Sequence, residues 1–220
     1  MQARYRTDYP GEFVILETKW SGGKKSETRE WIENPIENHH ISGRAVCIGS
    51  NVDFDQFNYC RLKYHRGGLL GSKKLQTYGT GPIALEMRLD FAVETHADTL
   101  SKILESEYQV NNIVYTTPRN CVNNPGEFYL IPYNPRLVDL ATIVYLAAFD
   151  GHKEIFLLGY LDYTEGGQNN WVDQLTKIFV AYPGVKFHLV GESTRMPEPW
   201  VECANTKNLT YREFISYCDV

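Results

Sequence analysis

The chain has 220 residues, of which 43% are hydrophobic and 22% are charged, a composition ordinary for a globular protein. This length accommodates one α/β domain with a full core and is short for two, so we expect a single domain over residues 1–220. The net charge of −5 argues against nucleic acid as a partner, because binding the phosphate backbone requires a basic face.

Cysteine usage and hydropathy point to a cytoplasmic setting. The number of cysteines is odd and no two of them form a C-x-x-C pair, which favours reduced thiols over a disulfide framework or a zinc site. The sequence shows no signal peptide and no run of about 18 apolar residues, so we expect no membrane span. The five cysteines are Cys47, Cys60, Cys121, Cys203 and Cys218.

Residues 1–40 predict a small N-terminal extension. "EFVILETKW" and "TREWIENPI" are strand candidates separated by the turn-like "SGGKKSE", which predicts a β-hairpin. The hairpin around Trp20 and Trp31 is expected to form either a part of an acceptor site or a contact in a homo-oligomer.

The next segments alternate between strand and helix patterns. "GRAVCIGSN" is a short apolar run that closes on Gly49-Ser50-Asn51, as the first strand of an open α/β sheet does before its ligand loop. "FNYCRLKYH" and "SKKLQTYGTG" are the second and third strand candidates. The stretch from Ala84 to Tyr108 carries helical spacing of its apolar residues, and "NNIVYTTP" is a further short strand.

The C-terminal half continues the alternation. "PRLVDLATIVYLAAFDG" predicts a helix, with Pro135 near its start and Gly151 after its end. "KEIFLLGY" predicts a strand, "NWVDQLTKIFVAYPG" a helix and "VKFHLVG" a last strand. The whole pattern predicts an α/β protein with a single Rossmann-like, open and largely parallel sheet, helices on both faces and the small N-terminal hairpin.

Ligands of open α/β sheets bind beyond the carboxyl ends of the strands, which directs attention to the loops at residues 49–51, 67–72, 116–118 and 159–168. Glycine in such loops lets backbone N–H groups approach a phosphate, although glycine also simply ends strands. "RGGLLGSKK" does not fit the phosphate loop of nucleotide triphosphatases. Asp53 and Asp55 have the D-x-D spacing of a metal-binding pair, and two acids there can equally cap a helix.

Two segments resemble sialyltransferases. Residues 133–163 are similar to the second conserved block of the family, nearest to the bacterial members that sialylate lipooligosaccharide, and residues 54–79 are similar to the first block of the eukaryotic members. The matching residues of the second block are Asn134, Arg136, Gly151, Lys153, Glu154, Ile155, Gly159 and Tyr163. Those of the first block are Arg61, Gly71, Ser72 and Lys73.

The resemblance implies a nucleotide-sugar-binding fold that needs no metal and no cofactor besides the sugar donor. The cytidine of the donor would lie over Gly49, Ser50 and Asn51, and Tyr163 would donate a hydrogen bond to a phosphate oxygen of the leaving group. Arg136 would help to neutralise charge there. The resemblance places five further residues around the donor: Arg61, Lys63, Asn134, Gly159 and Tyr160.

The sequence also departs from the family pattern. The expected Arg-x-Asn is Arg61-Leu62-Lys63, and the expected Ser/Thr-Gly that contacts the donor is Val138-Asp139-Leu140. No histidine follows the aromatic turn, so the general base would be another group, for which Asp162 and Glu165 are the candidates.

We therefore expect a glycosyltransferase-like protein that binds a nucleotide sugar, such as a CMP-sugar, and an unknown glycan or small-molecule acceptor. The alternative is a non-catalytic descendant of the sialyltransferase fold that acts in binding or assembly. A third hypothesis, transfer that depends on a metal held by Asp53 and Asp55, would appear as nucleotide binding that requires manganese.

Overall fold

The computed structural model describes residues 1–9, 11–33, 43–49, 57–58, 62, 75–160, 171–192 and 196–218. Its strands are β1 (Glu12–Ser21), β2 (Lys24–Glu33), β3 (Arg44–Ile48), β4 (Gln76–Thr80), β5 (Phe91–Val93), β6 (Ile113–Thr116), β7 (Tyr129–Leu130), β8 (Glu154–Leu158), β9 (Lys186–Val190) and β10 (Thr206–Leu209). Its helices are η1 (Arg6–Asp8), α2 (Gly81–Glu86), α3 (Ala97–Glu105), α4 (Tyr108–Asn111), α5 (Pro118–Asn123), α6 (Asp139–Phe149), α7 (Trp171–Ala181), α8 (Glu198–Val201) and α9 (Tyr211–Cys218).

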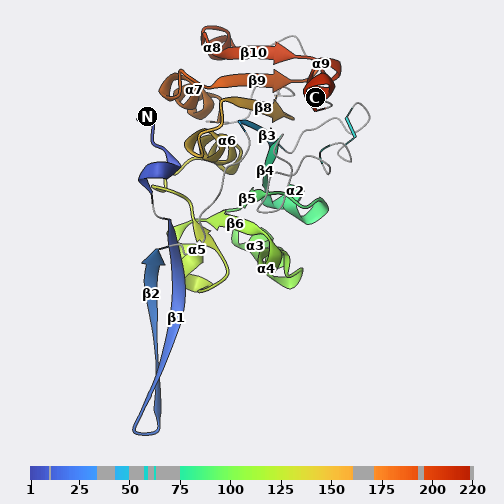
Figure 1. Ribbon diagram of the computed structural model, residues 1–220. Coiled ribbons are helices and arrows are strands. Elements are labelled where there is room, and N and C mark those ends of the chain that lie inside the picture. The colour runs from blue at the N-terminus through green and yellow to red at the C-terminus, as the bar shows by residue number, and fades with distance from the viewer. Residues whose placement is uncertain are drawn as a thin grey trace.

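The expected α/β fold is confirmed, with one ten-stranded sheet in the order β10-β9-β8-β3-β4-β5-β6-β7-β1-β2 (Figure 1). All neighbouring pairs from β10 to β7 are parallel. The chain builds outward from β3 toward β7, then returns to the other side of β3 with β8 and continues to β10. The direction of winding therefore reverses between β3 and β8, as in a doubly wound sheet.

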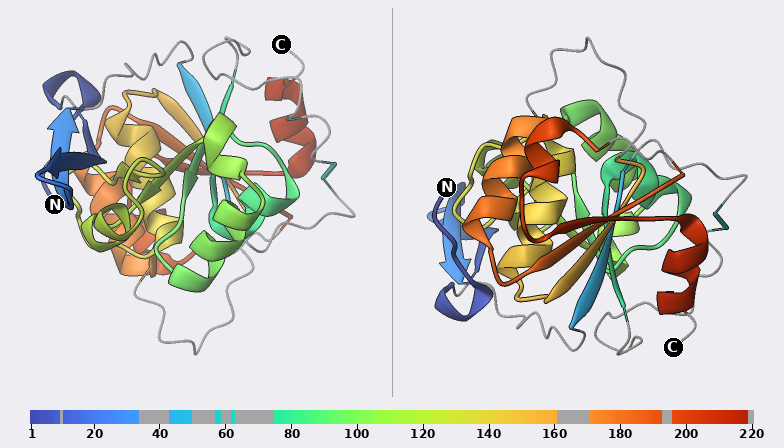
Figure 2. Two further views of the ribbon diagram at one scale, coloured as in Figure 1. Left: turned by 90° about the horizontal axis from the view of Figure 1, so that it is seen from below. Right: turned by 90° about the horizontal axis from the view of Figure 1, so that it is seen from above.

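Side chains of successive strand residues alternate between two hydrophobic clusters, one on each face of the sheet. In β3, Ala45 and Cys47 face the cluster formed with α6, α7 and α8, while Val46 and Ile48 face the cluster formed with α2, α3 and α9. Figure 2 shows the sheet edge-on between these two groups of helices. Both faces are covered, which explains why the parallel strands read as continuous apolar runs.

Helix α6 is the central helix of the first face, and nine of its residues are buried. A helix that is apolar all round is a core helix. The chain reaches it through a strained segment, since Tyr133, Asn134 and Arg136 all have positive φ angles, of 57°, 40° and 56°. Tyr133 is held in place by Arg4, whose guanidinium carbon lies 3.9 Å from the centre of its ring.

The N-terminal hairpin is also confirmed. β1 and β2 pair antiparallel over ten positions, from Glu12 opposite Glu33 to Ser21 opposite Lys24. The turn is made by Gly22 and Gly23, whose positive φ angles of 56° and 77° suit a two-residue hairpin loop. The hairpin is joined to the parallel sheet through the antiparallel pairing of β1 with β7.

The single helix expected between Ala84 and Tyr108 is wrong. α2 ends at Glu86, β5 follows, and α3 begins only at Ala97. The break is fixed by Asp90, which accepts hydrogen bonds from the N–H and the hydroxyl of Thr77 at 2.8 and 2.9 Å. These bonds align the chain beside β4, so that the three residues of β5 become a buried central strand.

Other expectations were incomplete. β9 is not the last strand, because β10 pairs with its outer edge. Within the second expected strand, residues 57–65, Leu62 is helical, and only Phe57 and Asn58 are otherwise described.

None of the helices in the described part of the chain has the length and hydropathy needed to cross a membrane.

The amino ends of the strands meet a buried polar network. Asp150, at the end of α6, accepts a hydrogen bond from Tyr78 at 2.6 Å and pairs with Arg6 at 2.7 Å. The Tyr78 hydroxyl also lies 2.9 Å from Nε2 of His152, and Arg6 donates to Tyr115 at 3.1 Å. The network fixes the N-terminal segment against the sheet.

Candidate ligand site at the carboxyl edge of the sheet

The loops after β3 and β8 meet where the strand order reverses, which is where open α/β sheets bind their ligands. The N–H of Gly49 donates to the carbonyl of Leu158 at 2.8 Å. A Cβ atom on Gly49 would lie 3.0 Å from the carbonyl oxygen of Gly159, so the two backbone segments are close enough that a side chain at position 49 would require one of them to shift. Gly159 itself turns the chain with a φ angle of 74°.

The first turn of α6 lies against both loops. A Cβ atom on Gly49 would be 3.3 Å from the side chain of Leu140, and the carbonyl of Leu140 accepts a hydrogen bond from Tyr160 at 2.9 Å. The N–H of Val138, just before the helix, donates to Gln174 on α7 at 2.9 Å. The positive end of the α6 dipole therefore faces the carboxyl edge, where it favours an anion.

Glu94, His96 and Asp139 form a second group at the same edge, one that joins the loop after β5 to the start of α6. Nδ1 of His96 lies 3.0 Å from Oε1 of Glu94 and 3.5 Å from Oδ2 of Asp139. The backbone N–H of His96 donates to the same Oε1 at 2.7 Å. Nδ1–H is thus the donor to the Glu94 carboxylate, which directs Nε2 away from it.

The three side chains differ sharply in exposure. The side chain of Glu94 is 2% exposed, that of Asp139 is 11% exposed, and that of His96 is 79% exposed. Within the described part of the chain, Nε2 of His96 makes no hydrogen bond. An ordered imidazole whose one nitrogen is held by a buried carboxylate and whose other nitrogen faces solvent is suited to proton transfer.

The electrostatics of the pair match this role. Burial raises the pKa of Glu94, with a further contribution from the neighbouring Asp139 carboxylate, while the hydrogen bonds from His96 act in the opposite direction. The hydrogen bond to Glu94 raises the pKa of His96, and the charge of Asp139 adds to this effect. A histidine so placed has a pKa above its ordinary value.

Neighbouring elements hold the group in place. Thr95 donates to Asp139 twice, from its N–H at 3.1 Å and from its hydroxyl at 2.8 Å. Asn120 on α5 donates to the carbonyl of Thr95 at 3.0 Å and to the hydroxyl of Thr116 at 2.9 Å. The ends of β5 and β6 and the start of α6 are thereby tied into one polar edge.

Gly81 completes the support of Glu94. It is the first residue of α2, and a Cβ atom there would overlap Oε2 of Glu94 and press on the side chain of Thr99. The carboxylate can therefore pack against the start of α2 only because position 81 has no side chain.

The atoms that could bind a metal lie within 4.8 Å of one another in Glu94, His96 and Asp139. This spacing is compatible with a divalent cation. It is equally the spacing of a hydrogen-bonded carboxylate–histidine pair with a second acid beside it.

The structure places the predicted site residues unequally. Gly49 and Gly159 are brought together, as the sequence led us to expect. Tyr160 is buried with its hydroxyl engaged by Leu140, so it positions α6. Asn134 and Arg136 precede α6, and their side chains form no hydrogen bond or ion pair with the described residues. The remaining predicted residues lie outside the described ranges: Ser50, Asn51, Arg61, Lys63, Asp162, Tyr163, Glu165, and the D-x-D pair Asp53 and Asp55.

The sequence did not single out Glu94, His96 or Asp139. Asp139 was considered only as a departure from the sialyltransferase pattern, and the other two fell inside a predicted helix. A usable signal was present, because Glu94 and His96 flank a threonine directly after the apolar triplet Phe91-Ala92-Val93, which is how a short buried strand ends. Arg119, exposed beside Asn120, is a further cation at this edge that was missed.

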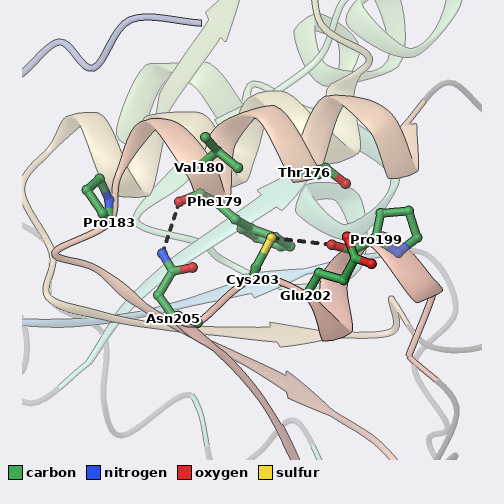
Figure 3. Close-up of a pocket in the computed structure, with 9 residues that line it drawn as sticks. Thr176, Phe179, Val180, Pro183, Pro199, Glu202, Cys203 and Asn205 are labelled. Atoms are coloured by element: carbon green, nitrogen blue, oxygen red, sulfur yellow. Dashed lines mark hydrogen bonds between the residues drawn. The ribbon is translucent and has the colours of Figure 1, made fainter.

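A shallow cavity lies at the opposite end of the strands (Figure 3). Its volume is about 400 Å³, and it lies between the last turns of α7 and the segment from α8 to β10. Cys203 in its wall donates to the carbonyl of Pro199 at 3.4 Å, and Asn205 donates to that of Phe179 at 3.0 Å. Burial raises the pKa of Cys203, which disfavours the reactive thiolate. The cavity therefore offers no activated thiol at the amino edge.

Comparisons of the chain with protein-family models, with curated proteins and with solved structures gave no match.

Proposed function

We propose that this protein binds a nucleotide sugar at the carboxyl edge of its sheet and transfers the sugar to an acceptor hydroxyl. The observation that carries the proposal is the meeting of the Gly49 and Gly159 loops with the first turn of α6 at the reversal of strand order. Backbone N–H groups and the helix dipole at such a position suit the phosphate of a nucleotide. The resemblance of residues 133–163 to sialyltransferases supports a CMP-sugar as the donor.

His96 is the general base in this proposal. Nε2 accepts the proton of the acceptor hydroxyl as the oxygen attacks the anomeric carbon of the sugar. The bond from that carbon to the phosphate oxygen breaks, and the nucleotide leaves with the electron pair. Glu94 stabilises the imidazolium that forms, because Nδ1–H donates to its carboxylate at 3.0 Å.

In this proposal, the Glu94–His96 pair replaces the catalytic histidine that the sialyltransferase pattern leads one to expect and this chain lacks. The sialyltransferase histidine is expected after the aromatic turn, where this chain has none. His96 instead follows β5, two strands away from β3 on the same edge. Arg119, exposed at the start of α5 after β6, is the cation that this proposal assigns to stabilising the phosphate leaving group.

A binding protein without catalysis is the second candidate. It is favoured by the hydrogen bonds of Thr95 to Asp139 and of the His96 N–H to Glu94, because such a group also serves simply to fasten α6 to the sheet. The two candidates share the nucleotide site and differ in the role of His96.

The first test is a thermal-shift screen of the purified protein against CMP, UDP, GDP and their sugars, with and without manganese. A ligand that binds only the folded state stabilises it by about 2.7 kcal/mol at 100 times its Kd, a readily measured rise in Tm. We expect a shift with CMP and CMP-sugars in the absence of metal. A flat response to the whole panel would contradict the proposal, and a shift only with manganese would favour the metal-dependent hypothesis.

The second test separates catalysis from binding. With the sugar nucleotide that binds, His96→Gln is expected to keep the thermal shift and to lower the rate of nucleotide release by about 10²–10⁴-fold, the usual contribution of a general base. Glu94→Gln should lower the rate less, because the base remains. Lys102→Gln, an exposed change on the same helix as His96, is the matched control and should alter neither quantity. Equal rates in all four proteins would favour the binding role.

A further inference from the structure

The β1–β2 hairpin extends away from the body of the molecule (Figure 1). Every residue of β2 is exposed except Ile32, which is half-buried, and in β1 only Val14 is fully buried. Its ties to the body are at its base, where Phe13 pairs with Tyr129 and the carbonyl of Val14 accepts a hydrogen bond from Gly126 at 2.7 Å. A two-stranded ribbon of this kind is marginally stable alone in water, so its length calls for a partner.

The exposed large apolar residues of the ribbon share one face, whereas the half-buried Phe13, Ile15 and Ile32 lie on the other. The pairing places Val14 opposite Trp31, Leu16 opposite Arg29 and Trp20 opposite Lys25, all on the same side. Leu16, Trp20 and Trp31 are 44%, 70% and 40% exposed. Exposed tryptophan on an extended ribbon is typical of protein–protein contacts.

Among the described strands β2 is the last of the sheet, and none of them pairs with its outer edge over its ten residues. Such an edge is a template for pairing with another strand. Two-fold symmetric pairing of β2 with its own copy must be antiparallel and centred on one residue, which then faces its copy. The candidate registers can therefore be compared residue by residue.

Centring the pairing on Thr28 gives charge complementarity along the strand. Glu27 then faces Arg29 twice, Lys25 faces Trp31 twice, and Ser26 faces Glu30 twice. Shifting the centre to Glu27 would place it opposite its own copy and Lys25 opposite Arg29. Shifting the centre to Arg29 would place it opposite its own copy. Like charges directly opposite are destabilising, so neither shift is favoured.

We propose that two copies of this chain join β2 to β2 in the register centred on Thr28. The hairpins then form a continuous four-stranded antiparallel ribbon, with Leu16, Trp20 and Trp31 of both copies on one face. Lys25 places its ammonium over the Trp31 ring of the other copy, a favourable cation–π arrangement. Glu27 contacts Lys25 of its own strand, an exposed pair of small energetic value that does not compete with Arg29 of the copy.

The register can be tested by exchanging charges in the full chain, with mass measured by sedimentation velocity over a concentration series. We expect a dimer for the unchanged protein. Glu27→Arg and Arg29→Glu each place like charges opposite one another and should each give a monomer. An equimolar mixture of the two single variants should restore a dimer, because both opposing pairs are then attractive. The double variant E27R/R29E should dimerise by itself.

Several outcomes would overturn the proposal. They are a monomeric unchanged protein at all concentrations, single variants that remain dimeric, or single variants whose mixture stays monomeric. Both substituted side chains are exposed, so unchanged circular dichroism and an unchanged Tm in the monomeric state would show that the variants fold. Lys24→Glu, which faces Ile32 in the proposed register, is the matched control and should leave the dimer largely intact.

Discussion

The two ends of the parallel strands hold the same kinds of side chain in opposite circumstances. At the amino edge, Asp150 and His152 are buried and bonded through Tyr78. At the carboxyl edge, Glu94 is buried but its partner His96 has a side chain that is 79% exposed. A carboxylate and a histidine in proximity therefore do not define a site. The open nitrogen of the histidine distinguishes the second group from the first.

The difference follows from the fold. The amino edge is closed by the N-terminal segment, where Arg6 supplies the charge that Asp150 needs. At the carboxyl edge, the described residues leave Nε2 of His96 uncovered. The amino-edge network is expected to act on stability and the carboxyl-edge group on function.

The largest expected effect is at the amino edge. Arg6→Met leaves the Asp150 carboxylate, whose side chain is fully buried, without its cation. Breaking a buried ion pair by removing one partner typically costs about 3–5 kcal/mol. Urea unfolding measures this loss. Arg212→Met, an exposed change on α9, is the control and should stay within about 0.5 kcal/mol. Equal losses in the two variants would show that the amino edge is not closed by Arg6.

A smaller effect is expected from Gly81→Ala at the carboxyl edge. The added Cβ displaces the Glu94 carboxylate, and such overpacking costs about 1–3 kcal/mol. In a Glu94→Ala background the same change should cost much less, because the overlapping oxygen is gone. Gly184→Ala, where a Cβ would meet nothing within 4 Å, is the control. A cost of Gly81→Ala that does not depend on Glu94 would refute this packing.

The smallest expected effect is a difference in pH dependence between His96 and His188. The hydrogen bond to Glu94 raises the pKa of His96, so its stabilising contribution is full below pH 6.5 and is lost as the pH rises through the pKa of the folded state. Burial lowers the pKa of His188, despite Glu154 beside it, while Lys207 and Lys186 lower it further. The contribution of His188 to stability is therefore full above pH 6.5 and is lost as the pH falls through the pKa of the folded state.

The two histidines can be separated by urea unfolding between pH 5.5 and 8. Removing His96 by substitution with Gln should leave a free energy of unfolding that rises more steeply with pH than in the unchanged protein. In the His188→Gln variant, the free energy of unfolding should rise less steeply with pH than in the unchanged protein, or should fall. Parallel profiles for the two variants would contradict the opposite directions of the two pKa shifts.

Much of the architecture was predictable because its strands are continuous apolar runs closed by glycine. Residues 45–48 and 155–158 are of this kind, and the rule that parallel strands share a carboxyl edge is consistent with the close approach of Gly49 and Gly159. β5 was not predictable by periodicity, since three residues contain no repeat. β10, with the sequence Thr-Lys-Asn-Leu, lacks the apolar signal because it lies at the edge of the sheet.

The group around His96 was missed for a different reason: the local signal for Glu94 and His96 does not reveal their neighbour Asp139. Thr95 and Asp139 are 44 positions apart, and only the closure of α6 over the sheet brings them together. The interpretation of residues 84–108 as one helix left no place for the loop that contains Glu94 and His96. Local patterns specify elements, whereas this site depends on how distant elements pack.

Because the winding reverses beside β3, this strand lacks one of its two neighbours while the nascent chain is being synthesised. β3 needs β8 as its second neighbour, yet β8 is synthesised about 100 residues later, on the order of ten seconds at typical rates of translation. Until then, one edge of a mostly apolar strand is open on the ribosome. We expect the nascent chain to be vulnerable to aggregation during this interval, and chaperones that shield extended segments to determine its yield.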